Sequence, residues 1–217
     1  MNGRLEVCGD HGSEKMIYDV RMGPQGLFCD GRLFVVYQAS RERGAAHPHI
    51  VCRDPEGRWL DPVRIGTAAR PDHHLAPIIW LDDRRHFHVL YHCHFVENES
   101  CHIVSSRPLD ISRWEHGRLL ASSITYPRVL TCPDGRRVLY YRALGHIGYW
   151  TYRLSEDGRH WSPPAGPLVD FDQKPQLPGD EWSGSYHSVA LGADGNTLHV
   201  AFVRWDERRR INPLYGR

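Results

Sequence analysis

The sequence predicts an all-β protein, and the main reason is a repeated pattern. Four stretches each hold a short apolar run, a tight turn centred on an aspartate, and a second apolar run rich in β-branched and aromatic residues. The stretches are Leu27–Ala39, Pro77–His94, Pro127–Ala143 and His187–Arg204. Their turn aspartates, Asp30, Asp82, Asp134 and Asp194, are separated by 52, 52 and 60 residues. Hairpins that repeat every 40–50 residues or so are typical of propeller blades, so we predict a β-propeller of four-stranded antiparallel blades.

The local chemistry of each stretch agrees with a hairpin. Asp-Gly at 30–31, 134–135 and 194–195 supplies the positive φ angles that two-residue hairpin turns require. The alternating apolar residues on both sides of each turn need one buried face. In the second stretch Asp82-Asp83 replaces Asp-Gly, so we expect a longer or differently shaped turn there.

A second signal follows each of the first three hairpins. It is a turn sequence that ends in tryptophan, at Asp54–Trp59, Ser106–Trp114 and Ser155–Trp161. The last resembles the Asp-box pattern Ser-x-Asp-x-Gly-x-Thr-Trp in a compressed form. In that motif the serine and aspartate close a turn between the outer strands, and the tryptophan packs between blades. We therefore expect a single domain over 1–217 with repeat units at 20–66, 72–120, 124–170 and 184–217.

The number of repeats predicts an incomplete propeller, with about three and a half to four blades out of an expected seven. No tryptophan of this kind follows Asp194. An open propeller would expose unpaired strand edges and an apolar blade face, so missing blades or a second chain would be needed to close it. The non-periodic stretch Asp170–Ser183 is expected to be a loop insertion that contributes binding surface.

Composition narrows the function classes. The chain has 217 residues, 41% of them hydrophobic and 24% charged, with a formal net charge of +1, which fits a globular protein without a nucleic-acid partner. No apolar run approaches the 18 or so residues of a membrane span, so we expect no membrane partner. The first fifteen residues lack the apolar core of a secretion signal. The six cysteines contain no CxxC pair and predict no disulfide framework.

The candidate site residues lie immediately before and after the hairpin cores. In a propeller, the loops that enter the innermost strands of successive blades gather on one face around the central channel. This position is occupied by His74, Tyr126 and Tyr186 in three consecutive units, and His94 and Arg142 end the channel-lining strands. Two imidazoles, two phenols and a guanidinium at one channel mouth would form an acid–base set with a built-in cation.

A metal site is the alternative use of one segment. Cys93, Cys101 and His102 lie close in sequence, near His92 and His94. The spacing matches no standard zinc pattern, and His92 and His94 would share a strand face that Cys93 avoids. We therefore expect no metal in the candidate site and no cofactor for catalysis, and a structural zinc remains the competing hypothesis.

Four segments carry a family resemblance. They are DHHLAPIIWLDDRRHFHVLYHCH at 72–94, TYPRVLTCPDGRRVLYYRALGH at 125–146, GYWTYRLSEDGRHWSPP at 148–164 and SYHSVALGADGNTLHVAFVRWDERRRIN at 185–212. They resemble consecutive blades of the BNR-4 group of bacterial neuraminidase repeat proteins, over about residues 27–215. The group includes seven-bladed ulvan lyases, which cleave uronic-acid-containing algal polysaccharide by β-elimination. The resemblance implies an acidic polysaccharide partner and a secreted or periplasmic location, which the chain itself leaves unknown.

The resemblance also implies residue roles. His74, Tyr126 and Arg142 would be catalytic, with the histidine and tyrosine exchanging protons in an order left open. The planar arginine fork would neutralise the substrate carboxylate. Substrate binding would fall to His94 and Tyr186. We add His73 and Trp205 as further substrate-binding candidates from their positions beside the hairpins.

Two other functions compete with the lyase hypothesis. A sialidase-like glycoside hydrolase needs three arginines, a Tyr/Glu nucleophile pair and an acidic Asp. The available glutamates, Glu97, Glu99 and Glu181, lie at unequal positions in the repeats, which disfavours it. A non-catalytic carbohydrate-binding propeller would use Trp182, Trp205 and Tyr186 as stacking platforms.

Overall fold

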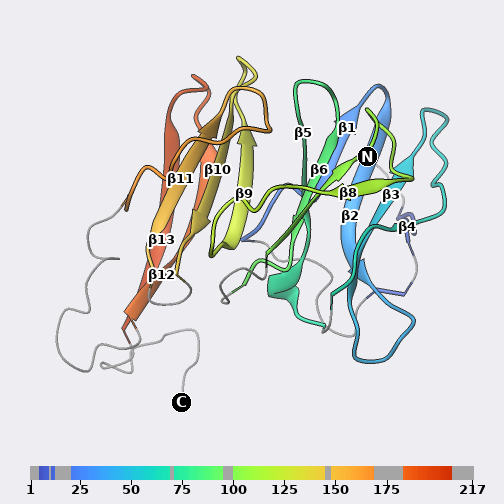
Figure 1. Ribbon diagram of the computed structural model, residues 1–217, viewed down its shortest axis with the longest axis horizontal. Coiled ribbons are helices and arrows are strands. Elements are labelled where there is room, and N and C mark those ends of the chain that lie inside the picture. Colours follow the sequence, from blue (N-terminus) through green and yellow to red (C-terminus); the bar gives the residue numbers. More distant parts are fainter. Residues whose placement is uncertain are drawn as a thin grey trace. The chain divides into compact units, whose positions relative to one another are not determined.

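Antiparallel strands, together with one short 3-10 turn, make up the regular structure of the described residues in the computed structural model (Figure 1). The structure describes residues 5–9, 11–12, 21–68, 71–94, 100–144, 148–168 and 183–206, without the side chains of 183–184 and 204–206. The chain divides into two compact units. Unit 1 comprises Met1–His92 and Cys101–Arg118, and unit 2 comprises Cys93–Ser100 and Leu119–Arg217. Among the residues described, no helix has the length and hydropathy to cross a bilayer.

Unit 1 contains two four-stranded sheets, each a meander of antiparallel neighbours. The first has the order β1-β2-β3-β4, with β1 Gly26–Cys29, β2 Arg32–Ala39, β3 His47–Arg53 and β4 Val63–Arg64. The second has the order β5-β6-β7-β8, with β5 Ile78–Leu81, β6 Phe87–Tyr91, β7 Cys101–Ser105 and β8 Trp114–His116. The prediction of four-stranded antiparallel sheets is confirmed in this unit.

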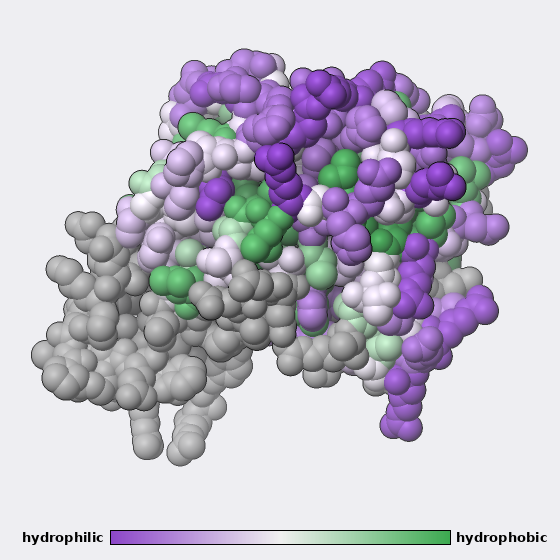
Figure 2. All heavy atoms as spheres, viewed as in Figure 1, coloured by the Kyte–Doolittle hydropathy of each residue, from purple (hydrophilic) through white to green (hydrophobic). Residues whose placement is uncertain are grey.

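Apolar side chains from both sheets of unit 1 form one core. Alternate residues of β2 and β3, such as Phe34 and Ile50, pack with Ile79, Phe87 and Val89 of the second sheet. The rings of Phe34 and Phe87 lie 4.6 Å apart between centroids. In Figure 2 most of the coloured surface is hydrophilic or neutral, with small apolar patches. The period-2 alternation therefore buries one face of each sheet against the other.

Unit 2 contains the strands of the third and fourth predicted hairpins. One sheet has the order β11-β10-β9, with β9 Thr125–Thr131, β10 Arg137–Arg142 and β11 Trp150–Ser155. The other pairs β12, Ser183–Leu191, with β13, Leu198–Asp206. Arg128 links the two sheets by donating from Nη1 to the carbonyl oxygen of Val189 at 3.2 Å. The expected insertion at 170–183 lies, apart from Ser183, outside the described residues.

The turns correct one expectation. Asp30 and Gly31 form a two-residue turn, with φ angles of 49° and 73°. Asp134-Gly135 and Asp194-Gly195 instead sit within longer loops, Cys132–Arg136 and Gly192–Thr197. In both loops only the glycine has a positive φ, and the aspartate side chain accepts backbone N–H bonds. The Asp-Gly pairs therefore predicted the positions of the hairpins but not the lengths of their loops. The loop at Asp82, residues 82–86, is longer than two residues, as expected, and it has the same length as the loop at Asp134.

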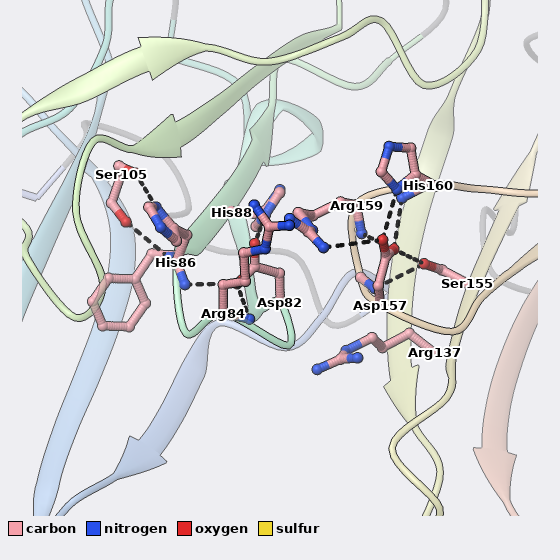
Figure 3. Close-up of polar contacts among 12 residues, drawn as sticks. Asp82, Arg84, His86, His88, Ser105, Arg137, Ser155, Asp157, Arg159 and His160 are labelled. Atoms are coloured by element: carbon pink, nitrogen blue, oxygen red, sulfur yellow. Dashed lines mark hydrogen bonds and ion pairs between the residues drawn. The ribbon is translucent and has the colours of Figure 1, made fainter.

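The compressed Asp box is a closed turn, as expected. Asp157 Oδ1 accepts hydrogen bonds from the backbone N–H groups of Arg159 and His160, both at 2.8 Å (Figure 3). Ser155 Oγ accepts the Gly158 N–H at 2.8 Å. Burial alone would raise the pKa of Asp157, but the bonds from His160, Arg159 and Ser155 bring it well below its usual value. The motif thus fixes the chain direction after β11.

Candidate functional site

Tyr126 occupies an irregular position in β9. Arg142 pairs with Thr125 and Tyr140 pairs with Arg128, so Tyr126 and Pro127 together face the single residue Tyr141. This is a β-bulge, which redirects a side chain relative to the regular alternation. Tyr126 has a φ of 53°, an uncommon conformation for a large L residue, and its side chain is fully buried. Backbone strain of this kind often accompanies a functional position.

Arg142 ends β10 directly beside this bulge, and it is also fully buried. Its guanidinium carbon lies 5.0 Å from the ring centroid of Tyr126, 5.5 Å from that of Tyr186 and 6.0 Å from that of Trp150. Nη1 donates to the carbonyl oxygen of Ser185 at 3.3 Å. Aromatic faces attract a cation without neutralising it, so the contacts stabilise a positive charge inside unit 2.

Two more predicted residues join this group. The ring of His94 lies 5.8 Å from that of Tyr126, and the ring of Tyr186 lies 5.8 Å from it as well. Unit 2 therefore brings together four of the predicted site residues: His94, Tyr126, Arg142 and Tyr186. Trp205 belongs to β13, where it pairs with Gly184, but its side chain lies outside the described residues.

His74 and His73 lie in unit 1, in the 3-10 turn His73–Leu75. Asp72 caps this turn, and its Oδ1 accepts both the backbone N–H of His74, at 3.0 Å, and the ring Nδ1–H, at 2.6 Å. Burial lowers the pKa of His74, although the bond to Asp72 acts in the opposite direction. The ring centroid of His73 lies 3.7 Å from that of His74, with the two rings tilted by 37°. A neutral His74 that donates through Nδ1 carries its lone pair on Nε2, the arrangement of an oriented base.

Asp72, His73 and His74 are also the one group of three potential metal ligands in the described part of the chain, with ligand atoms within 4.8 Å of one another. However, an Arg21 guanidinium nitrogen lies 3.4 Å from Nε2 of His73, and the His74 proton occupies the Asp72 oxygen. Both contacts disfavour a cation here. In the zinc hypothesis, His102 would be a ligand, but its two ring nitrogens contact His88 and the Arg118 carbonyl.

The sequence reasoning gave no role to several residues that complete the arrangement. Asp72 orients His74, and Trp150, Ser185 and His187 surround Arg142. A signal for two of them was present in the sequence. Ser185 and His187 flank Tyr186 in a strand, so they had to share the opposite face from it.

The comparisons with known proteins show the family to which the chain belongs. A family model described as BNR repeat-containing family member matches residues 60–213. The chain belongs to the BNR repeat-containing family. The match covers the second, third and fourth hairpins, which are the stretches that carry all of the candidate site residues.

The curated relatives include ulvan lyases. The chain is 26% identical over 215 residues to Ulvan Lyase-PL25 of Pseudoalteromonas sp. (strain PLSV), covering 87% of this chain and 42% of the relative. It is also 26% identical over 217 residues to the ulvan lyase of Alteromonas sp. (strain LOR), with 87% and 43% covered. The chain thus spans less than half the length of these relatives. The predicted resemblance to ulvan lyases is confirmed.

A solved structure shares the fold. It is a PL25 ulvan lyase described as bound to -[GlcA(1-4)Rha3S]-, with a TM-score of 0.78 and 22% sequence identity over 93% of this chain and 49% of that one. The match supports the antiparallel arrangement of the strands.

Proposed function

We propose that this chain carries the uronate-handling residues of a polysaccharide lyase that cleaves ulvan-type polymers by β-elimination. The observation that supports this most is the buried Arg142, enclosed by the rings of Tyr126, Tyr186 and Trp150 beside a strained bulge. The ulvan lyases among its relatives make a uronate the natural counter-ion for this guanidinium. An acidic polysaccharide is therefore the proposed partner. Because such polymers are met outside the cell, we expect the protein to act there.

β-Elimination needs three functions from the protein. A base takes the proton from the carbon next to the uronate carboxylate, and the electron pair forms a carbon–carbon double bond. The bond to the 4-linked sugar breaks, and an acid delivers a proton to the departing oxygen. Arg142 can bind the carboxylate in a bidentate manner and stabilise the charge that develops on it.

We base the proton-transfer roles on the orientation of His74 by Asp72 and on the hydroxyl group of Tyr126. His74 is oriented by Asp72 and has a lowered pKa, so it is neutral at neutral pH and suits the base. Tyr126 carries a hydroxyl proton and suits the acid. His94, Tyr186 and His73 are proposed to contact the neighbouring sugar. This assignment predicts that both His74 and Tyr126 are required for turnover.

The test is the appearance of unsaturated uronate, followed by its ultraviolet absorbance, when the protein is incubated with ulvan. Tyr126→Phe keeps the buried ring and removes the hydroxyl, and we expect turnover to fall by about 10²–10⁴-fold. Arg142→Lys keeps the charge and removes the planar fork, and should raise KM and lower kcat. Tyr152→Phe, on β11, and Arg136→Lys, in an exposed loop, are the matched controls.

Other outcomes would identify other functions. Tight ulvan binding without any unsaturated product from the folded wild-type protein would point to a non-catalytic carbohydrate-binding protein. Free sugar released without a double bond would point to a glycoside hydrolase. Either result would refute the elimination chemistry.

We also infer that the four hairpin sheets are blades of one propeller domain, completed by further blades or by a second chain. The support is the meander order in each four-stranded sheet, the repeat of the hairpins and the shared fold with the PL25 ulvan lyase. Measurement of the molecular mass and the scattering profile in solution would test this. A profile of two independently moving bodies would contradict it.

A further inference from the structure

His187 lies at the centre of a buried hydrogen-bond group in unit 2. It is 3% exposed, and both of its ring nitrogens have partners. Nδ1 lies 2.6 Å from the hydroxyl of Tyr140, and Nε2 lies 2.9 Å from Oγ of Ser185. The ring stacks on Trp150 with a centroid distance of 4.5 Å and an interplanar angle of 9°. Three neighbours on three strands therefore fix its position.

The residues that surround His187 also hold the hydrogen-bond acceptor of Arg142. The carbonyl oxygen of Ser185 accepts hydrogen bonds from Nη1 of Arg142 at 3.3 Å and from Nε1 of Trp150 at 3.1 Å. Because His187 binds the Ser185 side chain and stacks on Trp150, it fixes both the acceptor and its second donor. Any displacement of the His187 ring would move the carbonyl to which Arg142 is tied.

The electrostatic surroundings keep His187 neutral. The groups that face it are Tyr140 and Arg142 from β10, Trp150 from β11, Ser185 from its own strand and Phe202 from β13. Burial is the larger cause and the nearby Arg142 charge the smaller one that together lower the pKa of His187 to about 4. A neutral imidazole can donate at one nitrogen and accept at the other, so it satisfies both hydroxyl partners without adding a second cation beside Arg142.

We propose that His187 is a positioning residue for substrate binding, which sets the guanidinium of Arg142 through the Ser185 carbonyl and Trp150. The proposal rests on the proposed role of Arg142 as the uronate-binding group. His187 touches neither the substrate nor the transferred proton in this scheme. Its loss should therefore misplace the bidentate contact, and small misplacements of a binding group are costly to turnover.

The experiment compares wild-type protein with His187→Phe, His187→Gln and Tyr140→Phe, with His199→Gln on β13 as control. The Phe variant keeps a ring for stacking on Trp150 but loses both hydrogen bonds, whereas Gln keeps a neutral donor and acceptor. We expect kcat/KM on ulvan to fall at least tenfold for His187→Phe, less for His187→Gln and Tyr140→Phe, and within twofold for His199→Gln.

A second measurement does not depend on turnover. The Nε–Hε signal of Arg142 in the ¹⁵N-labelled chain, assigned as the signal lost in Arg142→Lys, reports the guanidinium environment. It should shift in His187→Phe and stay in place in His199→Gln. An unchanged signal in a folded His187→Phe protein, or unchanged kcat/KM, would overturn the proposal.

This design separates the proposal from the proposed function. If the wild-type protein shows no turnover, the elimination chemistry is refuted, while a shifted Arg142 signal still supports the positioning role of His187. If His187→Phe does not fold, the same two measurements on Tyr140→Phe decide. Wild-type behaviour of that variant in both would overturn the proposal.

Discussion

The stability of unit 1 should depend on the protonation of one buried histidine, His102 on β7. Its Nδ1 lies 2.9 Å from the Arg118 carbonyl oxygen, which can only accept, so this nitrogen carries the proton. Nε2 then accepts from Nδ1 of His88 at 3.0 Å, and Trp80 stacks over both rings. A proton added at Nε2 would place a positive charge inside this buried stack.

The magnitude follows from the pKa of this group. Burial, together with the neighbouring His88, lowers the pKa of His102 from 6.5 to about 4. The unfolded chain therefore binds a proton at this position near pH 6.5, and the folded chain binds it only near pH 4. The stability contributed by a neutral His102 is complete above pH 6.5 and is lost progressively as the pH falls to about 4. The difference between the pKa of 6.5 in the unfolded chain and the pKa of about 4 in the folded chain corresponds to about 3 kcal/mol of unfolding free energy.

The assay is equilibrium urea unfolding of wild-type protein and His102→Gln at closely spaced pH values between about 7 and 4. Glutamine has no proton to gain in this range, so the variant should lose about 3 kcal/mol less than wild type over the interval. His199 is an exposed histidine in unit 2, and His199→Gln serves as control. The dependence of its unfolding free energy on pH should follow that of the wild-type protein. Parallel loss of stability in wild type and His102→Gln would refute the reasoning. Figure 3 shows the adjoining Asp82 turn together with His86 and His88.

Two further predictions concern the turns of unit 2. Asp157→Ala removes the acceptor of two backbone N–H groups and of the Ser155 hydroxyl, so the free energy of unfolding should fall by about 1–3 kcal/mol. Asp157→Asn should recover part of this loss. An unchanged urea midpoint in Asp157→Ala would contradict the prediction. Gly135→Ala places a side chain at a φ of 90° in open space and should lower the free energy of unfolding by about 1 kcal/mol. At Gly195 a new Cβ would also lie 2.5 Å from Pro133, so Gly195→Ala should lower the thermal midpoint more than Gly135→Ala. The reverse order of thermal midpoints would contradict this prediction.

Local features of the sequence predicted the antiparallel all-β structure of the chain. Alternation of apolar residues and Asp-centred turns are short-range signals, and they located all four hairpins and the Asp box at Ser155–Trp161. The sequence did not predict loop length, because Asp-Gly can form a two-residue turn or lie within a longer loop, as Asp134-Gly135 does. The pairing of the flanking strands decides between the two. The family resemblance was equally visible, since it depends on the same local motifs.

For the candidate site, too, the sequence predicted the residue types but not their contacts. The residue types, Tyr126, Arg142 and Tyr186 among them, could be chosen from their repeated position next to the hairpin cores. Only the tertiary structure showed the bulge that turns Tyr126 inward and the carbonyl of Ser185 that receives Arg142. The physical reason is that a bulge is set by the register between two strands, and a buried polar contact by the packing of one sheet on another. Neither is encoded in any single segment, so the sequence alone determined which chemical groups are present, and the packing of the sheets determined which of them meet.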